Sequence, residues 1–218
     1  MKNHPIVDLR LYTMRQGGVP EFLRLAHEVV LPVQLRHIGP PVAYYVTDIG
    51  PQQEVMHLWG YESLADMEVR RNARNQDPEW PKYGEASDGL IDKQETSILR
   101  RIPLKVPQDA ECASADKPLV EFRVTTLHRR RLPEFLRLFE SQAMEIQMRH
   151  VGAPIALYTS DVGHLNQVIQ IWGYDSYADM EARRKDRDQE PRWASYLATR
   201  DPLVVAENVR IVRRVPGL

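Results

Sequence analysis

The chain has 218 residues, of which 43% are hydrophobic and 27% are charged, a balance typical of a globular protein with a core of its own. The formal net charge is −1 and the pI about 6.7, which excludes a general electrostatic attraction to nucleic acid or to an anionic membrane. Cys112 is the single cysteine, no intrachain disulfide can form, and residues 1–10 lack the apolar core of a signal peptide, so we expect a cytoplasmic protein without a membrane span.

The sequence repeats itself. A shift of 113 positions aligns residues 7–103 with 120–216 without a gap, and 40 of the 97 aligned pairs are identical. A period this long indicates a duplicated domain, because solenoid repeats run to about 50 residues at most. We therefore predict a first repeat over residues 1–103, a linker over 104–118 and a second repeat over 119–218.

The first half of each repeat predicts a strand followed by a helix. In VDLRLYT (7–13) apolar and polar residues alternate, as in a half-buried strand. The helix begins near Pro20 in PEFLRL (20–25), a segment that returns unchanged at 133–138.

The second half of each repeat predicts two strands, helical segments and a last strand. VAYYVTD (42–48) and VMHLWGY (55–61) form a hairpin, and Ser63 then begins a charged helix with a capping box. A short helix opens at DPEW (77–80), and ETSILRR (95–101) closes the unit. The order is β-α-β-β-α-β, the ferredoxin-like unit.

A four-stranded sheet with helices on one face leaves its other face uncovered. Two copies in one chain can cover each other, and a fifteen-residue linker reaches up to about 50 Å. The predicted fold class is therefore α+β, with two tandem ferredoxin-like βαββαβ repeats that form an intrachain dimeric α+β barrel.

Several segments resemble one known family. LRLYTMRQGGVPEFLRL, VMHLWGYESLADMEVRRNARNQDPEWPKY and ETSILRRIP, together with LNQVIQIWGYDSYADMEARR in the second copy, are similar to the NIPSNAP family. The resemblance implies a dimeric α+β barrel, which relatives usually form between chains. The family has no settled chemistry, and its mitochondrial members act partly as adaptors. Its wider fold group includes cofactor-free monooxygenases, isomerases, lyases and haem enzymes, which is an analogy of fold.

Strand alternation assigns each side chain to a face of the sheet. We expect Val7, Leu9 and Leu11 to lie under the helices, and the alternate residues to point into the barrel. The predicted inner face comprises Asp8, Arg10, Tyr12, Tyr45, Thr47, His57, Trp59, Tyr61 and Ser97, with Glu121, Arg123, Thr125, Tyr158, Ser160, Gln170, Trp172, Tyr174 and Arg210 in the second copy. Aromatic side chains mixed with a few charges favour a small-molecule pocket there.

Positions at which the copies differ favour a site in the first copy. His57 aligns with Gln170, Tyr12 with Thr125, Tyr44 with Leu157 and His27 with Glu140. An unperturbed histidine side chain has a pKa near neutrality, so His57 is our candidate general acid or base. Tyr12 is a candidate hydrogen-bond donor, and Arg10 can hold a carboxylate or an enolate. The expected substrate-binding residues are Asp8, Tyr45, Trp59, Tyr61, Arg123, Gln170 and Trp172.

Structural explanations compete with these roles. The Asp8–Arg10 and Glu121–Arg123 pairs recur in both copies, as a satisfied ionic cluster would. Trp59, Trp80, Trp172 and Trp193 are also explained as packing aromatics. His37 and His150 end equivalent helices and can cap their last carbonyls.

The sequence therefore favours a small-molecule-binding protein, and a cofactor-independent enzyme that uses acid/base chemistry on a small organic metabolite. The resemblance implies a monooxygenase, isomerase or lyase type of reaction, by analogy of fold. No metal or cofactor motif is present, and haem is the minor alternative, through His57, His37 or His150 as axial ligand. A second hypothesis is a non-catalytic NIPSNAP-type module that presents MEVRRNAR (67–74) and MEARRKDR (180–187) to a protein partner. Association of whole chains into a homo-oligomer is a further expectation.

Overall fold

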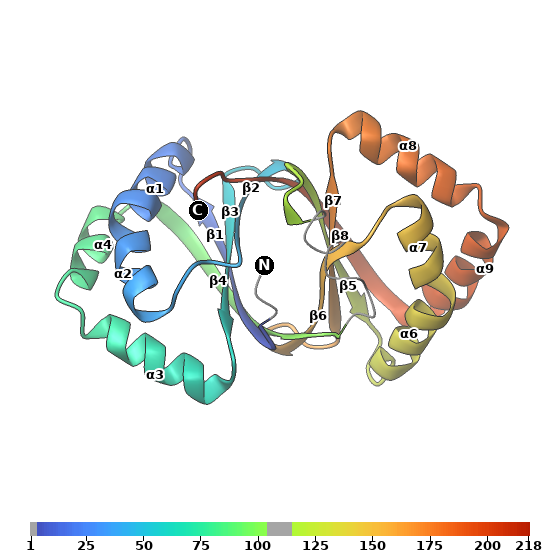
Figure 1. The fold of residues 1–218 in the computed structure, drawn as a ribbon, viewed down its shortest axis with the longest axis horizontal. Helices are drawn as coiled ribbons and strands as arrows, with labels where there is room; N and C mark the ends of the chain where they lie inside the picture. Colours follow the sequence, from blue (N-terminus) through green and yellow to red (C-terminus); the bar gives the residue numbers. More distant parts are fainter. Residues whose placement is uncertain (1–3, 104–114) are drawn as a thin grey trace. The chain divides into compact units, whose positions relative to one another are not determined.

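The computed structural model describes residues 4–103 and 115–218; most of the predicted linker, with Cys112, lies outside the described residues. The chain forms two compact units, Met1–Arg100 with Arg213–Leu218 and Arg101–Val212. Figure 1 labels their elements. No helix of the described residues is long and apolar enough to cross a membrane.

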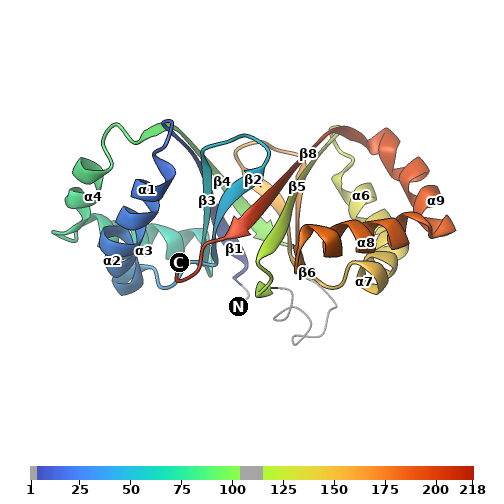
Figure 2. The same cartoon turned by 90° about the horizontal axis from the view of Figure 1, so that it is seen from above.

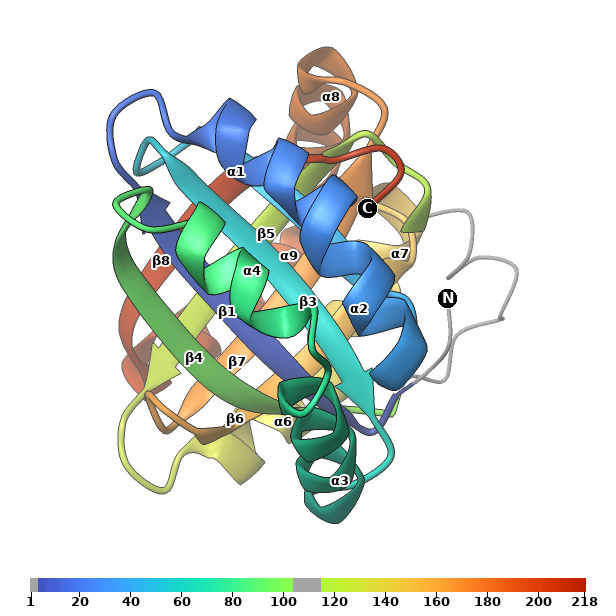
Figure 3. The ribbon, with the colours of Figure 1, turned by 90° about the vertical axis from the view of Figure 1, so that its left-hand side faces the viewer.

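The first unit is a four-stranded antiparallel sheet with helices on one face. The strands are in the order β4-β1-β3-β2, and Figure 3 shows the helices lying across them. The elements are β1 (Ile6–Met14), α1 (Val19–Leu25), the π-helical η1 (Ala26–Val30), α2 (Leu31–His37), β2 (Ala43–Ile49), β3 (Glu54–Tyr61), α3 (Leu64–Asn75), α4 (Trp80–Ala86) and β4 (Ile91–Arg101).

The second unit repeats this plan, with the strand order β8-β5-β7-β6 and its helices on one side of the sheet (Figure 2). Its elements are β5 (Leu119–Leu127), α6 (Leu132–Leu138), the π-helical η2 (Phe139–Ala143), α7 (Met144–His150), β6 (Pro154–Val162), β7 (Gln167–Tyr174), α8 (Tyr177–Asp188), α9 (Pro191–Arg200), η3 (Asp201–Leu203) and β8 (Val204–Arg214). The α+β class and the two tandem βαββαβ units are confirmed.

Local sequence signals account for the helix ends. Ser63 Oγ accepts a hydrogen bond of 3.0 Å from the Asp66 amide, as in a capping box, and the Asp66 carboxylate accepts one of 3.0 Å from the Glu62 amide, one residue before the N-cap. Gly39 follows α2 with φ +95°, a left-handed conformation in which glycine carries no steric penalty.

A buried core lies between helices and sheet in each unit, and it corrects the predicted faces. In the first unit this core includes Tyr12, Tyr44, Trp59 and Phe22. Asp8, Arg10 and Tyr12 therefore point under the helices, and Val7, Leu9 and Leu11 point the opposite way. The β3 residues predicted to point away from the helices, His57, Trp59 and Tyr61, also lie on the helix side. The predicted faces were wrong because α3 supplies Arg71, which pairs with Asp8. A paired carboxylate can be buried between helix and sheet, whereas an unpaired one could not.

The strand register corrects further side chains that were predicted to share the face of His57. His57 pairs across the sheet with Tyr44, whereas Tyr45 pairs with Met56 on the other face. Ser97 pairs with Leu9, and Thr47 hydrogen-bonds Glu54, both away from the helices.

The same correction holds in the second copy, whose Trp172 and Tyr174 pack in the helix-side core. The residues predicted to point away from the helices but found on the helix side are Glu121, Arg123, Thr125, Gln170, Trp172 and Tyr174. Leu157 pairs with Gln170, and Tyr158 therefore lies on the opposite face. Ser160 is two residues beyond Tyr158 and shares its face. Arg210 precedes Ile211, which packs in the helix-side core, so Arg210 also points away from the helices.

Candidate functional site

A cavity of about 90 Å³ lies between the sheet and the helices of the first unit. The strands contribute Asp8, Arg10, Tyr12, Tyr44, His57, Trp59 and Tyr61, and the helices contribute Phe22, Val30, Gln34, Arg74, Trp80 and Tyr83. Val30 ends the π-helical segment η1, a kind of irregularity that is frequent at functional sites.

His57 lies at the centre of this cavity wall and is 7% exposed. Its ring stacks on Tyr44 with centroids 4.9 Å apart and meets Tyr12 edge-on at 4.8 Å. Trp59 Nε1–H donates a hydrogen bond of 2.7 Å to its Nδ1. Burial, assisted by the positive charge of Arg10, lowers the pKa of His57 to about 3, so the ring is neutral at physiological pH.

The tautomer of His57 follows from this hydrogen bond. An indole N–H can only donate, so Nδ1 is the acceptor and the proton of the neutral ring is on Nε2. Nε2 is buried and has no hydrogen-bond partner among the described residues. A buried N–H donor thus lines the cavity without an acceptor, a state that costs about 1–3 kcal/mol unless something occupies it.

An ionic cluster forms one end of the site. Arg10 Nε donates to both carboxylate oxygens of Asp8, at 3.0 and 2.9 Å, and Arg71 from α3 contacts the same carboxylate. Asp8 is 2% exposed. Although burial opposes the charged form, Asp8 holds the pKa of Arg10 above its ordinary value. This geometry is the paired ionic cluster that the sequence predicted for Asp8 and Arg10 as the structural alternative to a substrate site.

Arg74 adds a third cation with no carboxylate of its own. Its guanidinium stacks 4.2 Å above the ring of Trp80 and donates to Asn75 Oδ1, but among the described residues no carboxylate lies within ion-pair distance. Burial, together with repulsion from Arg71 and Arg10, lowers its pKa. Among the described residues Asp8 pairs with Arg10 and Arg71 but not with Arg74, so this side of the site carries more positive than negative charge.

A buried amide completes the polar lining. Gln34 is 4% exposed, and its buried Oε1 has no hydrogen-bond partner in the part of the chain that the structure describes. Burial also raises the pKa of Tyr12, Tyr44 and Tyr83, so all three phenols stay protonated at neutral pH.

The second unit has an equivalent cavity of about 380 Å³. Glu121 pairs with Arg123, which lines this cavity, and with Arg184, as Asp8 does with Arg10 and Arg71. Gln170 replaces His57, and its Oε1 lies 3.4 Å from Nε1 of Trp172. The two residues thus accept the same indole N–H, and the difference between copies preserves this hydrogen bond.

The structure brings together six of the predicted site residues: Asp8, Arg10, Tyr12, His57, Trp59 and Tyr61. Tyr45 lies on the other face of the sheet, where it contacts Arg214. Arg123 and Gln170 line the cavity of the second unit, and Trp172 packs in its core. Whether any of these residues is catalytic stays a prediction.

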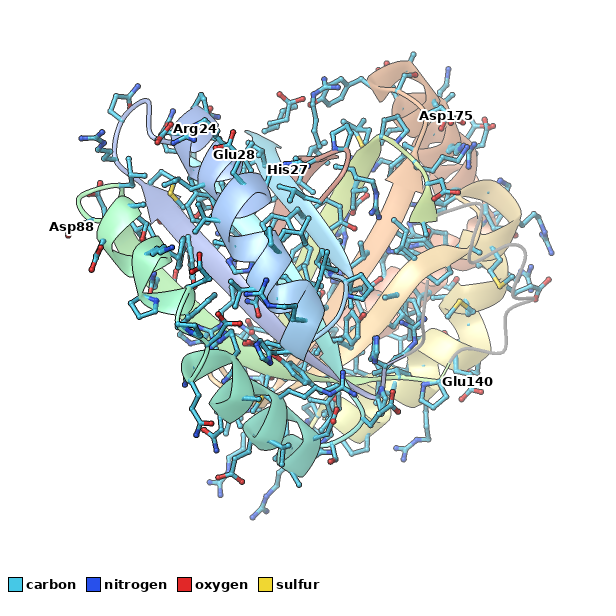
Figure 4. The ribbon with its side chains drawn as sticks, turned by 60° about the vertical axis from the view of Figure 1, so that its left-hand side comes forward. Arg24, His27, Glu28, Asp88, Glu140 and Asp175 are labelled. Atoms are coloured by element: carbon cyan, nitrogen blue, oxygen red, sulfur yellow. The ribbon has the colours of Figure 1, made fainter. Side chains whose placement is uncertain are left out.

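The remaining histidine candidates lie elsewhere. His27 lies in η1 and is exposed, and the equivalent Glu140 is exposed on the second unit (Figure 4). His37 Nε2 lies 2.8 Å from Asp77 Oδ2, and His150 Nε2 lies 3.8 Å from Glu190. The first pair connects the end of α2 to the turn before α4, and the second connects the end of α7 to the N-cap of α9, which indicates a structural role.

Sequence reasoning missed the contribution of the helices. Gln34, Arg74 and Tyr83 were not predicted as site residues. Tyr44 was singled out only as a difference between the copies, and Trp80 only as a packing aromatic. One signal was present, because Gln34 and Arg74 recur unchanged as Gln147 and Arg187. Polar residues shared by both copies on the inner side of helices mark the two cavities.

The described residues contain no group of three metal-ligating side chains that could hold an ion. The haem alternative does not fit His57, because a cavity of about 90 Å³ does not accommodate a macrocycle. Cofactor independence stays an expectation.

Comparison with known proteins now places the chain. The NIPSNAP family model matches residues 7–105 and 120–217. The chain belongs to the NIPSNAP family. It is similar to the NipSnap homolog of Dictyostelium discoideum, with 24% identity over 195 residues that cover 88% of this chain and 80% of the relative.

Solved structures share the fold of this NIPSNAP protein over nearly its whole length. A "putative monooxygenase" from Lactobacillus acidophilus covers 97% of this chain and 94% of its own, with a TM-score of 0.64 and 12% identity. An anthrone oxidase-like protein covers 98% of this chain and 92% of its own, with a TM-score of 0.62 and 14% identity. At these identities the likeness shows the fold alone.

Proposed function

We propose that the cavity of the first unit binds a small organic anion, with a carboxylate as its recognised group. One observation carries this proposal: the site combines a buried donor without an acceptor, His57 Nε2–H, with an arginine, Arg74, that has no carboxylate among the described residues. A carboxylate satisfies both, because it accepts hydrogen bonds and neutralises charge.

The walls define the kind of molecule. Phe22, Tyr12 and Tyr44 make much of the lining apolar, and about 90 Å³ limits the ligand to a small body. The unpartnered Oε1 of Gln34 can accept a hydrogen bond from a hydroxyl group of the ligand, and the N–H of the same amide can donate to a carbonyl oxygen. A small oxo- or hydroxy-acid fits this set of partners.

If the protein is an enzyme, His57 acts as a hydrogen-bond donor rather than as a proton carrier. With a pKa of about 3, its ring is a weak base and holds no second proton to give at neutral pH. A fixed N–H beside Arg10 stabilises negative charge that develops on a carbonyl oxygen, as in an enolate. This chemistry needs no cofactor and remains part of the proposal.

The alternative, an interaction module that presents charged helices, has less support. Arg70 and Arg71 of α3 are engaged within their own unit, by Asp66 and by Asp8. In α8 the equivalent Arg183 and Arg184 are held by Asp179 and Glu121. These charges stabilise the units and are less available to a partner.

Isothermal titration with pyruvate and benzoate, each compared with its amide, tests the anion site. We expect the carboxylates to bind the wild-type chain and the uncharged amides to bind at least tenfold more weakly. His57→Gln keeps an N–H donor and retains binding, whereas His57→Leu weakens it about tenfold, as expected for a lost buried hydrogen bond. Equal binding of acid and amide, or an unaffected His57→Leu variant, would contradict the proposal.

A further inference from the structure

We propose that the cavity of the second unit is a separate binding site for an uncharged aromatic molecule that carries a hydrogen-bond acceptor. The proposal rests on the size of this cavity, its aromatic walls, its internally neutralised charges and the free amide N–H of Gln170. It does not depend on the anion site of the first unit.

The second cavity is larger and has broad apolar walls. Its volume is about 380 Å³ against about 90 Å³ in the first unit. Phe139, Trp193 and Tyr196 line it and are all less than a tenth exposed. Thr125 occupies the position of Tyr12, so a ring that fills the first cavity is missing from the second unit. A planar aromatic ligand matches these walls.

The charges of the second cavity are already paired with one another. Arg123 contacts both Glu121 and Glu207, Arg187 pairs with Asp188 at 2.8 Å, and Arg200 pairs with Asp201 and Glu207. Gln94 occupies the position of Glu207 in the first copy, and Asn75 that of Asp188. A charged ligand would have to displace an internal partner here, so the site favours an uncharged one.

Gln170 supplies the directional contact. The indole N–H of Trp172 points at its Oε1 and thereby fixes the orientation of the amide, which leaves the amide nitrogen as the free donor. Gln170 is 4% exposed and lines the cavity, and the amide nitrogen donates to none of the described residues. A carbonyl or hydroxyl oxygen of the ligand would accept this hydrogen bond.

Titration of the full-length chain with 2-naphthol and with 2-naphthoate tests this site. The two probes share a ring system and differ in charge. We expect one 2-naphthol per chain and at least tenfold weaker binding of 2-naphthoate. Gln170→Leu should weaken 2-naphthol binding about tenfold through loss of the donor, whereas Gln170→His, the residue of the first copy, should keep it within about threefold.

Two further measurements separate failure of this site from failure of the anion site and from a loss of stability in the variants. Gln170→Leu should leave pyruvate binding unchanged, so failure of either site can be recognised independently of the other. A crystal of the wild-type chain soaked with 6-bromo-2-naphthol should show the anomalous bromine signal beside Trp193, whatever the stability of the variants. A signal outside this cavity, no signal, binding that ignores Gln170→Leu, or equal affinity for the two probes would overturn the proposal.

Discussion

The indole of Trp59 donates a 2.7 Å hydrogen bond to Nδ1 of His57, two residues earlier on the same strand. This bond fixes the tautomer of a buried, neutral imidazole and points its remaining N–H at the cavity. Trp172 and Gln170 repeat the relationship in the second unit at 3.4 Å. The exchange of histidine for glutamine between the copies therefore replaces a titratable group by one that does not titrate, but keeps an acceptor for the indole N–H.

His57 should make the stability of the protein depend on pH in acid. Its pKa is about 3 in the folded chain and about 6.5 when unfolded, so between these values the unfolded state binds the extra proton. The stability that the neutral ring contributes is present above pH 6.5 and is lost as pH falls towards 3. The wild-type chain should lose about 1.4 kcal/mol of unfolding free energy per pH unit below pH 6.5, and His57→Gln should not. By pH 5 the variant should therefore be about 2 kcal/mol more stable relative to wild type than it is at neutral pH.

Urea unfolding of both chains between pH 7.5 and pH 4.5 measures this difference. Gln170→His provides the matched control, because it should introduce the same acid sensitivity into the second unit. Parallel stability curves for wild type and His57→Gln would show that the folded chain protonates His57 easily.

Asp8→Asn should destabilise the protein more than Glu121→Gln does. The first change removes the one carboxylate of Arg10 and Arg71, which we expect to cost about 3 kcal/mol, as for a buried pair that loses one partner. In the second unit Arg123 keeps Glu207 when Glu121 is neutralised, so the loss is smaller. Chemical denaturation gives both values. An equal or larger loss for Glu121→Gln would mean that Glu207 does not compensate.

Arg74→Gln should separate binding from stability. Arg74 has no carboxylate within ion-pair distance among the described residues and is repelled by neighbouring arginines. Its removal should therefore change the free energy of unfolding by less than about 0.5 kcal/mol, because the lost stacking contact on Trp80 is offset by relieved repulsion. Pyruvate affinity should fall about tenfold, by the loss of a partly buried charge. Arg187→Gln, the matched change, should leave pyruvate binding as it was; calorimetry with pyruvate distinguishes the two.

Phe22→Ala and Phe135→Ala test the repeated PEFLRL segment. Both rings are almost completely buried, and each truncation should cost about 3–5 kcal/mol. Only Phe22 lines the anion site, so only its variant should also alter pyruvate binding. Thermal unfolding combined with titration checks both parts. A loss below about 1 kcal/mol would show that the helix is not anchored by this ring.

The sequence was sufficient for the two-unit organisation, because 40 identical pairs and the order of strand and helix signals leave little choice. It also identified Asp8, Arg10, Tyr12 and His57 as neighbours, since strand alternation groups them. The side of the sheet was not predictable in the same way. Alternation gives two sets of residues, and only the helix-borne partners, Arg71 for Asp8 and Phe22 for Tyr12, decide which set faces the helices. How the two units pair, and whether chains associate further, stay predictions.

The presence of both copies in one polypeptide has a consequence for how such sites can change. In an assembly of two identical subunits, every codon specifies both pockets, and a substitution alters them together. In this chain each pocket has codons of its own, and the two are always produced in equal stoichiometry. Selection can therefore change Tyr12 without changing Thr125, and a single gene can encode two pockets with different linings.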